Sequence, residues 1–185
     1  TPNLPQRIVV IGEGNTGNQS SMPSIPTEIL NLKTAGDLFG YGSPIYHTIR
    51  ILKPVSGPGV GGIPVFVHPQ PEAAGATARV QTLTVTGTAT ANGTHTLVIA
   101  GRKSQDGSSY SFVVSKDATP TEIASIISDT INNVIGSPVT ATSALGVVTI
   151  TSKWKGLTSQ LINVEVDIND TVTGVTYAVA ETAAG

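Results

Sequence analysis

The sequence predicts an α+β fold that is mainly β, in which a small antiparallel β-barrel or sandwich carries one packed helix. Three observations predict it. Between residues 76 and 185, short Val- and Thr-rich segments alternate apolar and polar side chains. One amphipathic segment, residues 120–135, interrupts these strands. The first 75 residues differ, because they mix short strands and helices with glycine and proline. Three strands, a helix and three or four more strands suit two layers with the helix across an open side.

The chain begins with a strand signal and continues into irregular sequence. Arg7–Ile11 predicts a buried strand, because four branched apolar residues follow one another. A stretch rich in Gly, Asn, Ser and Pro runs to Pro26, and residues 27–32 predict a second short extended piece. Residues 34–40 predict a single helical turn that glycine ends.

A short helix is predicted after Ser43-Pro44, because serine caps free amides and proline fits the first turn. Its apolar face consists of Ile45, Ile49 and Leu52, and Lys53-Pro54 ends it.

Residues 63–67 predict a strand, which Pro64 places at a sheet edge or at a strand start. Residues 69–75 predict a linker. We therefore expect a domain boundary that separates residues 1–75 from residues 76–185.

The second region begins with two predicted hairpins. Leu83 and Val85 lie on one strand, and Asn92-Gly93 predicts a type I′ turn into the next. Asp106-Gly107 predicts the second turn. The returning strands carry Leu97 and Ile99, and then Tyr110, Phe112 and Val114 on one face.

The helix at residues 120–135 has signals that agree with one another. Thr119 is its predicted N-cap, Pro120 its first residue and Glu122 the partner in a capping box. Gly136 and Pro138 end it. The predicted apolar stripe consists of Ile123, Ile126, Ile127, Ile131, Val134 and Ile135.

Further strands follow this helix. Residues 139–141 are predicted to pair with residues 147–150 through the loop 143–146. Residues 162–168 alternate Ile or Val with Asn, Glu and Asp, which predicts a strand with one wet face.

Composition excludes several functional classes. Charged residues make up 12% of the 185 residues, with a formal net charge of −2 and no basic cluster, so no nucleic-acid partner is expected. There is no cysteine, no apolar run long enough for membrane insertion, and no signal-peptide pattern at the start. Strands that are rich in Thr and poor in charge cost little to desolvate, which favours a subunit of an assembly.

Gly12–Gly17 spells G-x-G-x-x-G after a predicted strand. The dinucleotide fingerprint needs a helix to start at the second glycine, and Pro23 and Pro26 follow without an apolar stripe. A glycine-rich loop is the preferred interpretation, with a nucleotide enzyme as the third alternative.

Other reactive residues form no set. His47, His68 and His95 lie on separate elements without metal-type spacing, and we expect them to be surface or partly buried. Asp167, Asn169 and Asp170 lack the calcium-loop pattern and predict a turn. Trp154 is either a sugar platform or the cover of a barrel rim. We therefore predict no enzyme, and assign no catalytic, cofactor-binding or metal-binding residue.

Several segments, in order, resemble the contractile-tail sheath proteins of bacteriophages, in particular the Mu-like branch. The segments are residues 5–14, the A-x-x-L-F-G-x-G-S run at 35–43, residues 84–101, and residues 122–135 followed by 147–156.

This resemblance implies that residues 1–75 begin a core domain, here a partial α/β domain, and that the β-rich region is inserted into it. It also implies that the chain is the N-terminal portion or a truncated fragment of a longer sheath protein. Sheath subunits polymerise as rings or a helix around an inner tail tube, above a baseplate, and contract to drive the tube through the host envelope. The expected location is the virion tail, after assembly in the host cytoplasm. The alternative is a carbohydrate-binding or adhesin-like module that uses Trp154, Tyr110 or Tyr177.

Overall fold

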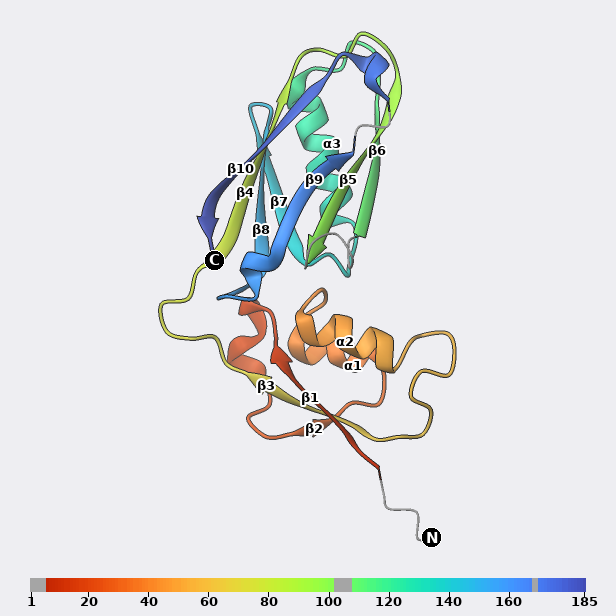
Figure 1. Ribbon diagram of the computed structural model, residues 1–185, viewed down its shortest axis with the longest axis vertical. Helices are drawn as coiled ribbons and strands as arrows, with labels where there is room; N and C mark the ends of the chain where they lie inside the picture. The colour runs from red at the N-terminus through yellow and green to blue at the C-terminus, as the bar shows by residue number, and fades with distance from the viewer. Residues whose placement is uncertain (1–5, 102–107, 168–169) are drawn as a thin grey trace. The chain divides into compact units, whose positions relative to one another are not determined.

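The computed structural model describes residues 6–101, 108–167 and 170–185, and it confirms a mixed α+β fold (Figure 1). The chain divides into two compact units, Thr1–Ala74 and Gly75–Gly185, and each has its own hydrophobic core. None of the helices in the described ranges is long and apolar enough to cross a membrane.

The first unit contains a three-stranded mixed sheet in the order β1-β3-β2. Its strands are β1 (Ile8–Glu13), β2 (Thr27–Glu28) and β3 (Val65–Gln70). β3 is the central strand, parallel to β1 and antiparallel to β2. Of the two alternatives predicted for residues 63–67, the strand start is therefore correct and the sheet edge is wrong. Pro64 lies just before the strand, where its missing N–H costs nothing, and its carbonyl accepts a hydrogen bond from the Ile8 amide at 3.0 Å.

Two helices, α1 (Leu32–Phe39) and α2 (Pro44–Leu52), complete this unit. α1 is longer than the predicted single turn, because the Asn31 side chain accepts a hydrogen bond from the Thr34 amide at 2.9 Å and so starts the helix earlier. The predicted extended piece 27–32 shortens accordingly to β2. The start of α2 is confirmed: Ser43 Oγ accepts a hydrogen bond from the Tyr46 amide at 3.1 Å. The core consists of Val10, Ile29, Ala35, Phe39, Ile45, Ile49, Val65 and Val67.

The second unit is a sandwich of two antiparallel sheets, in the orders β10-β4-β8-β7 and β6-β5-β9. The strands are β4 (Ala78–Thr86), β5 (Gly93–Gly101), β6 (Ser108–Val114), β7 (Val139–Ala144), β8 (Val147–Lys155), β9 (Ile162–Asp167) and β10 (Thr176–Ala184). Neither sheet closes on itself, so of the two predicted architectures the sandwich is correct and the barrel is wrong. α3 (Pro120–Asn132) packs against β4, β7 and β8 of one sheet and against β6 of the other.

The hairpin predicted at Asn92-Gly93 is wrong. β4 and β5 belong to different sheets, so this segment crosses between layers. The Asn92 side chain instead accepts a hydrogen bond from the Lys116 amide at 2.7 Å. A two-residue turn with positive φ at both positions occurs between β7 and β8, at Leu145 (φ 49°) and Gly146 (φ 79°). β5 and β6 pair as predicted, and the turn residues Asp106-Gly107 lie outside the described residues.

The capping box of α3 is confirmed. The Thr119 amide donates to Glu122 Oε2 at 2.8 Å, and the Glu122 amide donates to Thr119 Oγ1 at 3.4 Å. The end of the helix differs from the prediction, because α3 stops at Asn132. Val134 and Ile135 therefore leave the predicted stripe and are 42% and 65% exposed.

The side chain of Asn132, the last residue of α3, ties the helix to β7. Its Nδ2 donates to the Ala141 carbonyl at 2.8 Å, and its Oδ1 accepts from the Ala141 amide at 3.0 Å. Ser128 Oγ donates to the same carbonyl at 3.0 Å. Ala141 lies on β7, the last strand of its sheet, so α3 seals the outer backbone of that strand as another strand would.

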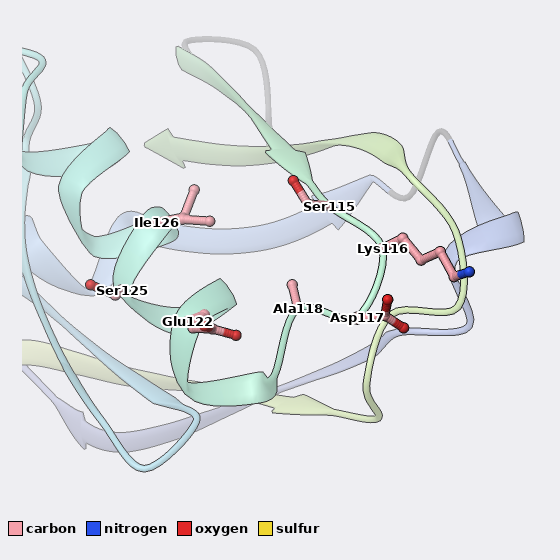
Figure 2. A pocket seen from close by; sticks show the side chains of 7 residues that line it. All are labelled: Ser115, Lys116, Asp117, Ala118, Glu122, Ser125 and Ile126. Atoms are coloured by element: carbon pink, nitrogen blue, oxygen red, sulfur yellow. The ribbon is translucent and has the colours of Figure 1, made fainter.

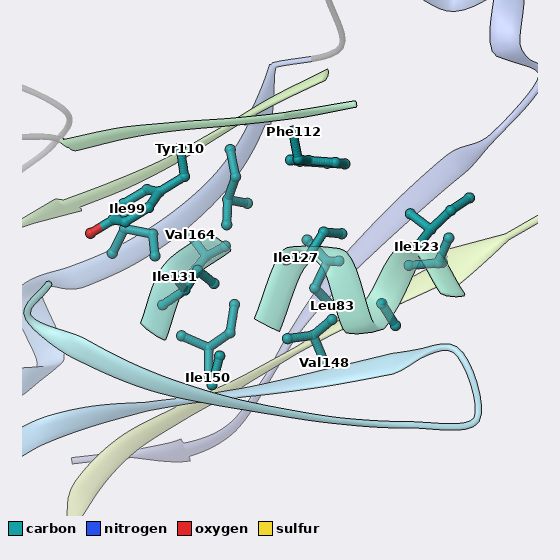
Figure 3. Packing of buried hydrophobic residues seen from close by; sticks show 14 of the residues in the cluster. Leu83, Ile99, Tyr110, Phe112, Ile123, Ile127, Ile131, Val148, Ile150 and Val164 are labelled. Carbon is teal, nitrogen blue, oxygen red and sulfur yellow. The ribbon is translucent and has the colours of Figure 1, made fainter. Parts of the chain in front are cut away.

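The core of the second unit lies between the sheets and α3 (Figure 3). The predicted faces of β6 and β9 are confirmed: Tyr110, Phe112 and Val114 are buried, as are Ile162 and Val164. Ile168, the end of the predicted last strand, lies outside the described residues. β10 was not predicted, because its Ala-rich sequence lacks an apolar alternation.

Candidate interaction surface

The sheet of the first unit has a covered face and an uncovered face. Val10, Val65 and Val67 point into the core that α1 and α2 share. The alternate residues Val9 and Ile11 are 59% and 66% exposed. Their partners in register on β3 are Phe66 and His68, which are only half-buried. We call the surface formed by Val9, Ile11, Phe66 and His68 the open face.

Charged groups lie at the border of the open face. The Arg7 guanidinium carbon lies 5.6 Å from the centroid of the Phe66 ring, a cation–π contact. Glu28 on β2 lies directly opposite Phe66 and is exposed. Because directly opposite residues point to the same side of a sheet, Glu28 borders the open face as well. The open face thus has an apolar centre with charged groups of both signs at its border.

This surface corrects the prediction that residues 7–11 form a buried strand. β1 is an edge strand, and half of its side chains face outward. Sheets with parallel pairing normally have both faces covered, and their strands have continuous apolar sequences such as Ile8–Ile11. The sequence of β1 therefore suits a strand that is buried on both faces. Burying a Val or Ile side chain contributes roughly 1.5–3 kcal/mol, so covering this face would be favourable.

The Gly12–Gly17 loop has no α-helix after it. β1 is followed by a 3-10 helix, η1 (Thr16–Ser21). A side chain at Gly14 would collide with Met22 and lie 3.0 Å from the Phe39 carbonyl. Asn15 donates from its amide to that carbonyl at 2.8 Å and from its side chain to the Tyr41 carbonyl at 3.0 Å. The loop thus packs on the connection between α1 and α2, and this close packing explains why a glycine is required at position 14.

The three histidines lie on α2 (His47), β3 (His68) and β5 (His95). The expectation of partial burial is wrong for His95, which is 0% exposed because both ring nitrogens find hydrogen-bond partners. Asp170 makes a turn, as predicted, since its Oδ1 accepts a hydrogen bond from the Val172 amide at 3.2 Å. Asn169 lies outside the described residues. Within the described ranges, no three His, Cys, Asp or Glu side chains are grouped as a metal site would require.

The aromatic rings proposed as a sugar platform are largely buried. Tyr110 and Trp154 are 2% and 6% exposed. Tyr110 donates to Ser137 Oγ at 3.1 Å and Trp154 Nε1 donates to Thr158 Oγ1 at 3.0 Å. Tyr177 is half-buried, and its hydroxyl is hydrogen-bonded to His95 Nδ1 at 2.6 Å. Burial raises the pKa of both tyrosines. A platform needs an exposed ring face, so Tyr110 and Trp154 serve the core.

An open hollow of about 510 Å³ lies at the start of α3 (Figure 2). It is lined by Ser115, Lys116, Asp117, Ala118, Glu122, Ser125 and Ile126. The Glu122 carboxylate belongs to the capping box, and hydrogen bonds from the Thr119 amide and hydroxyl hold its pKa below the usual range. The Glu122 carboxylate is thus engaged in capping α3, and the hollow lies where that helix begins.

Comparison with protein-family models and with curated proteins finds no match to this chain.

Proposed function

We propose that this chain is a structural subunit of a contractile bacteriophage tail sheath, which polymerises around the inner tail tube and contracts to drive it through the host envelope. Its partners are other copies in a ring or helical lattice, the tube protein and the baseplate. Its location is the virion tail, after assembly in the host cytoplasm. The ordered resemblance of residues 5–14, 35–43, 84–101, 122–135 and 147–156 to sheath proteins supports this proposal.

The open face is the observation that carries the proposal. A subunit of a lattice must bury apolar surface against its neighbours or against further sheath sequence, and Val9, Ile11 and Phe66 offer such surface on one face of a sheet. The low charge content of 12% reduces both repulsion between copies and the cost of desolvation. Neither property requires a reaction or a bound cofactor.

The test uses the complete reading frame that contains these 185 residues. We expect the purified product to form regular rings or tubes in negative-stain electron microscopy. Val9→Glu should prevent them, because an interface at the open face would have to desolvate a carboxylate, a cost that Arg7 at the border offsets only in part. Val113→Glu is the matched control, since Val113 on β6 is also 59% exposed. A product that stays monomeric at high concentration, or a Val9→Glu variant that assembles normally, contradicts the proposal.

A further inference from the structure

His95 joins three segments that are distant in sequence. Its Nδ1 lies 2.6 Å from the Tyr177 hydroxyl on β10. Its Nε2 lies 3.1 Å from the carbonyl of Asp170, the residue just before the short helix η3 (Thr171–Thr173). The same nitrogen lies 3.1 Å from Oγ1 of Thr173, the last residue of that helix. His95 itself is on β5, in the sheet that does not contain β10. One side chain thus connects the two layers of the sandwich.

The hydrogen-bond pattern fixes the form of the ring. A carbonyl oxygen only accepts, so Nε2 carries the proton and donates to Asp170. Nδ1 then accepts from the Tyr177 hydroxyl. Ring contacts strengthen the cluster, because His95 meets Tyr177 and Phe112 edge-on at centroid distances of 5.5 and 5.8 Å.

Tyr177 of this cluster is the one β10 side chain that packs against the apolar core, and the rest of β10 is held by its pairing with β4 and by the ion pair between Glu181 and Arg79 at 2.8 Å. The buried core contains residues from β4 to β9 and from α3, but from β10 it includes only Tyr177, as a partly buried neighbour. The other β10 side chains are exposed, apart from Ala183, which is half-buried. β10 pairs with β4 alone, as the first strand of its sheet. Its departure would therefore leave the apolar core nearly intact.

We propose that His95, Tyr177, Asp170 and Thr173 form a clasp that holds β10 to the sandwich, and that opening this clasp releases β10 from β4 while the other strands stay folded. The clasp works because the Tyr177 hydroxyl and the His95 ring are buried together, so a missing partner leaves a buried polar atom unsatisfied. Edge elements with few buried contacts are those that open separately from the global unfolding of a domain.

Amide hydrogen exchange of the 185-residue chain, followed by mass spectrometry, tests the clasp. Tyr177→Phe keeps the ring and removes the hydroxyl, and we expect exchange in residues 176–184 to be about tenfold faster. The amides of β5, β6 and β8 should keep their rates. Tyr110→Phe is the matched control, because it removes another buried hydroxyl from the same core, and it should leave β10 unchanged.

Two outcomes would overturn the proposal. In one, β10 exchanges at its original rate in Tyr177→Phe. In the other, all strands of the unit accelerate together, which would make Tyr177 an ordinary core residue. If Tyr177→Phe does not fold, Thr173→Val removes the hydroxyl on the opposite side of His95 and is read in the same way.

Discussion

The two units of this chain bury their sheets differently. In the second unit, both sheets turn their apolar faces inward and α3 fills the remaining side, so the core is enclosed. In the first unit, α1 and α2 cover one face of the sheet while Val9 and Ile11 remain exposed on the other. The second unit thus has the enclosed core that is typical of a self-sufficient domain. The first has a surface that its own residues do not cover, and this is where the proposed assembly contacts lie.

The same substitution in the two units gives the largest expected contrast. Ile127→Ala, in α3 at 1% exposure, should lower the free energy of unfolding by about 2–5 kcal/mol. Ile11→Ala, at 66% exposure, should change it by less than about 0.5 kcal/mol. Urea denaturation of each variant measures both values. Comparable losses at the two positions would show that the open face is covered in solution.

A substitution in a turn of the second unit should have a smaller effect of the opposite sign, an increase in the free energy of unfolding. Leu145 has a φ of 49° and is 92% exposed, so it carries backbone strain without contributing to the core. Asn tolerates this conformation, and Leu145→Asn should stabilise the unit by roughly 0.5–1 kcal/mol. Thermal unfolding monitored on both units should show an increase confined to the second. A loss of stability would mean that Leu145 makes a contact with another molecule or unit.

The smallest expected effect is a change of stability with pH, which one acidic residue contributes in each unit. Hydrogen bonds from the Thr119 amide and side chain lower the pKa of Glu122, and a hydrogen bond from Lys33, with another from Tyr41, lowers the pKa of Asp37. A lowered pKa means that each contribution is complete above the ordinary carboxyl pKa and is lost as the pH falls through the lowered value. Glu122→Gln and Asp37→Asn should therefore destabilise at neutral pH and have little effect in acid.

Salt distinguishes these two carboxylates. The Lys33–Asp37 pair is an exposed ion pair at 2.6 Å, so 1 M salt should abolish most of the Asp37→Asn effect. The Glu122 cap bonds to a neutral amide and hydroxyl, and its effect should persist. Denaturation curves at two pH values and two salt concentrations measure this. An equal response to salt would contradict the assignment of either contact.

Local signals predicted the locations of the helices and of most strands, although α1 begins earlier and α3 ends earlier than predicted. The capping box at Thr119 and Glu122 and the serine cap at Ser43 depend on residues within one turn of each other, so sequence spacing is sufficient. The paired β7 and β8 are adjacent in the chain and were predicted for the same reason.

Pairing between distant strands was not predictable in this way. Asn92-Gly93 has the ideal composition for a hairpin, but β4 pairs with β8 and β10, which lie far away in the chain. The actual tight turn contains Leu145, which propensity would not select. The clasp joins His95 to residues at least 75 positions away and could not be inferred from spacing. The open face was missed because the apolar run of β1 gives no sign of which face lacks a cover.

The seal that Asn132 and Ser128 place on Ala141 gives the four-stranded sheet a direction. Backbone groups on the outer side of β7 at that point are already satisfied by α3, whereas the opposite border of the sheet is formed by β10, which carries small side chains. A foreign strand would therefore find its template at the β10 border, or on β4 once β10 has left. At Ala141, by contrast, a further strand could pair only after the hydrogen bonds from Asn132 and Ser128 had been broken.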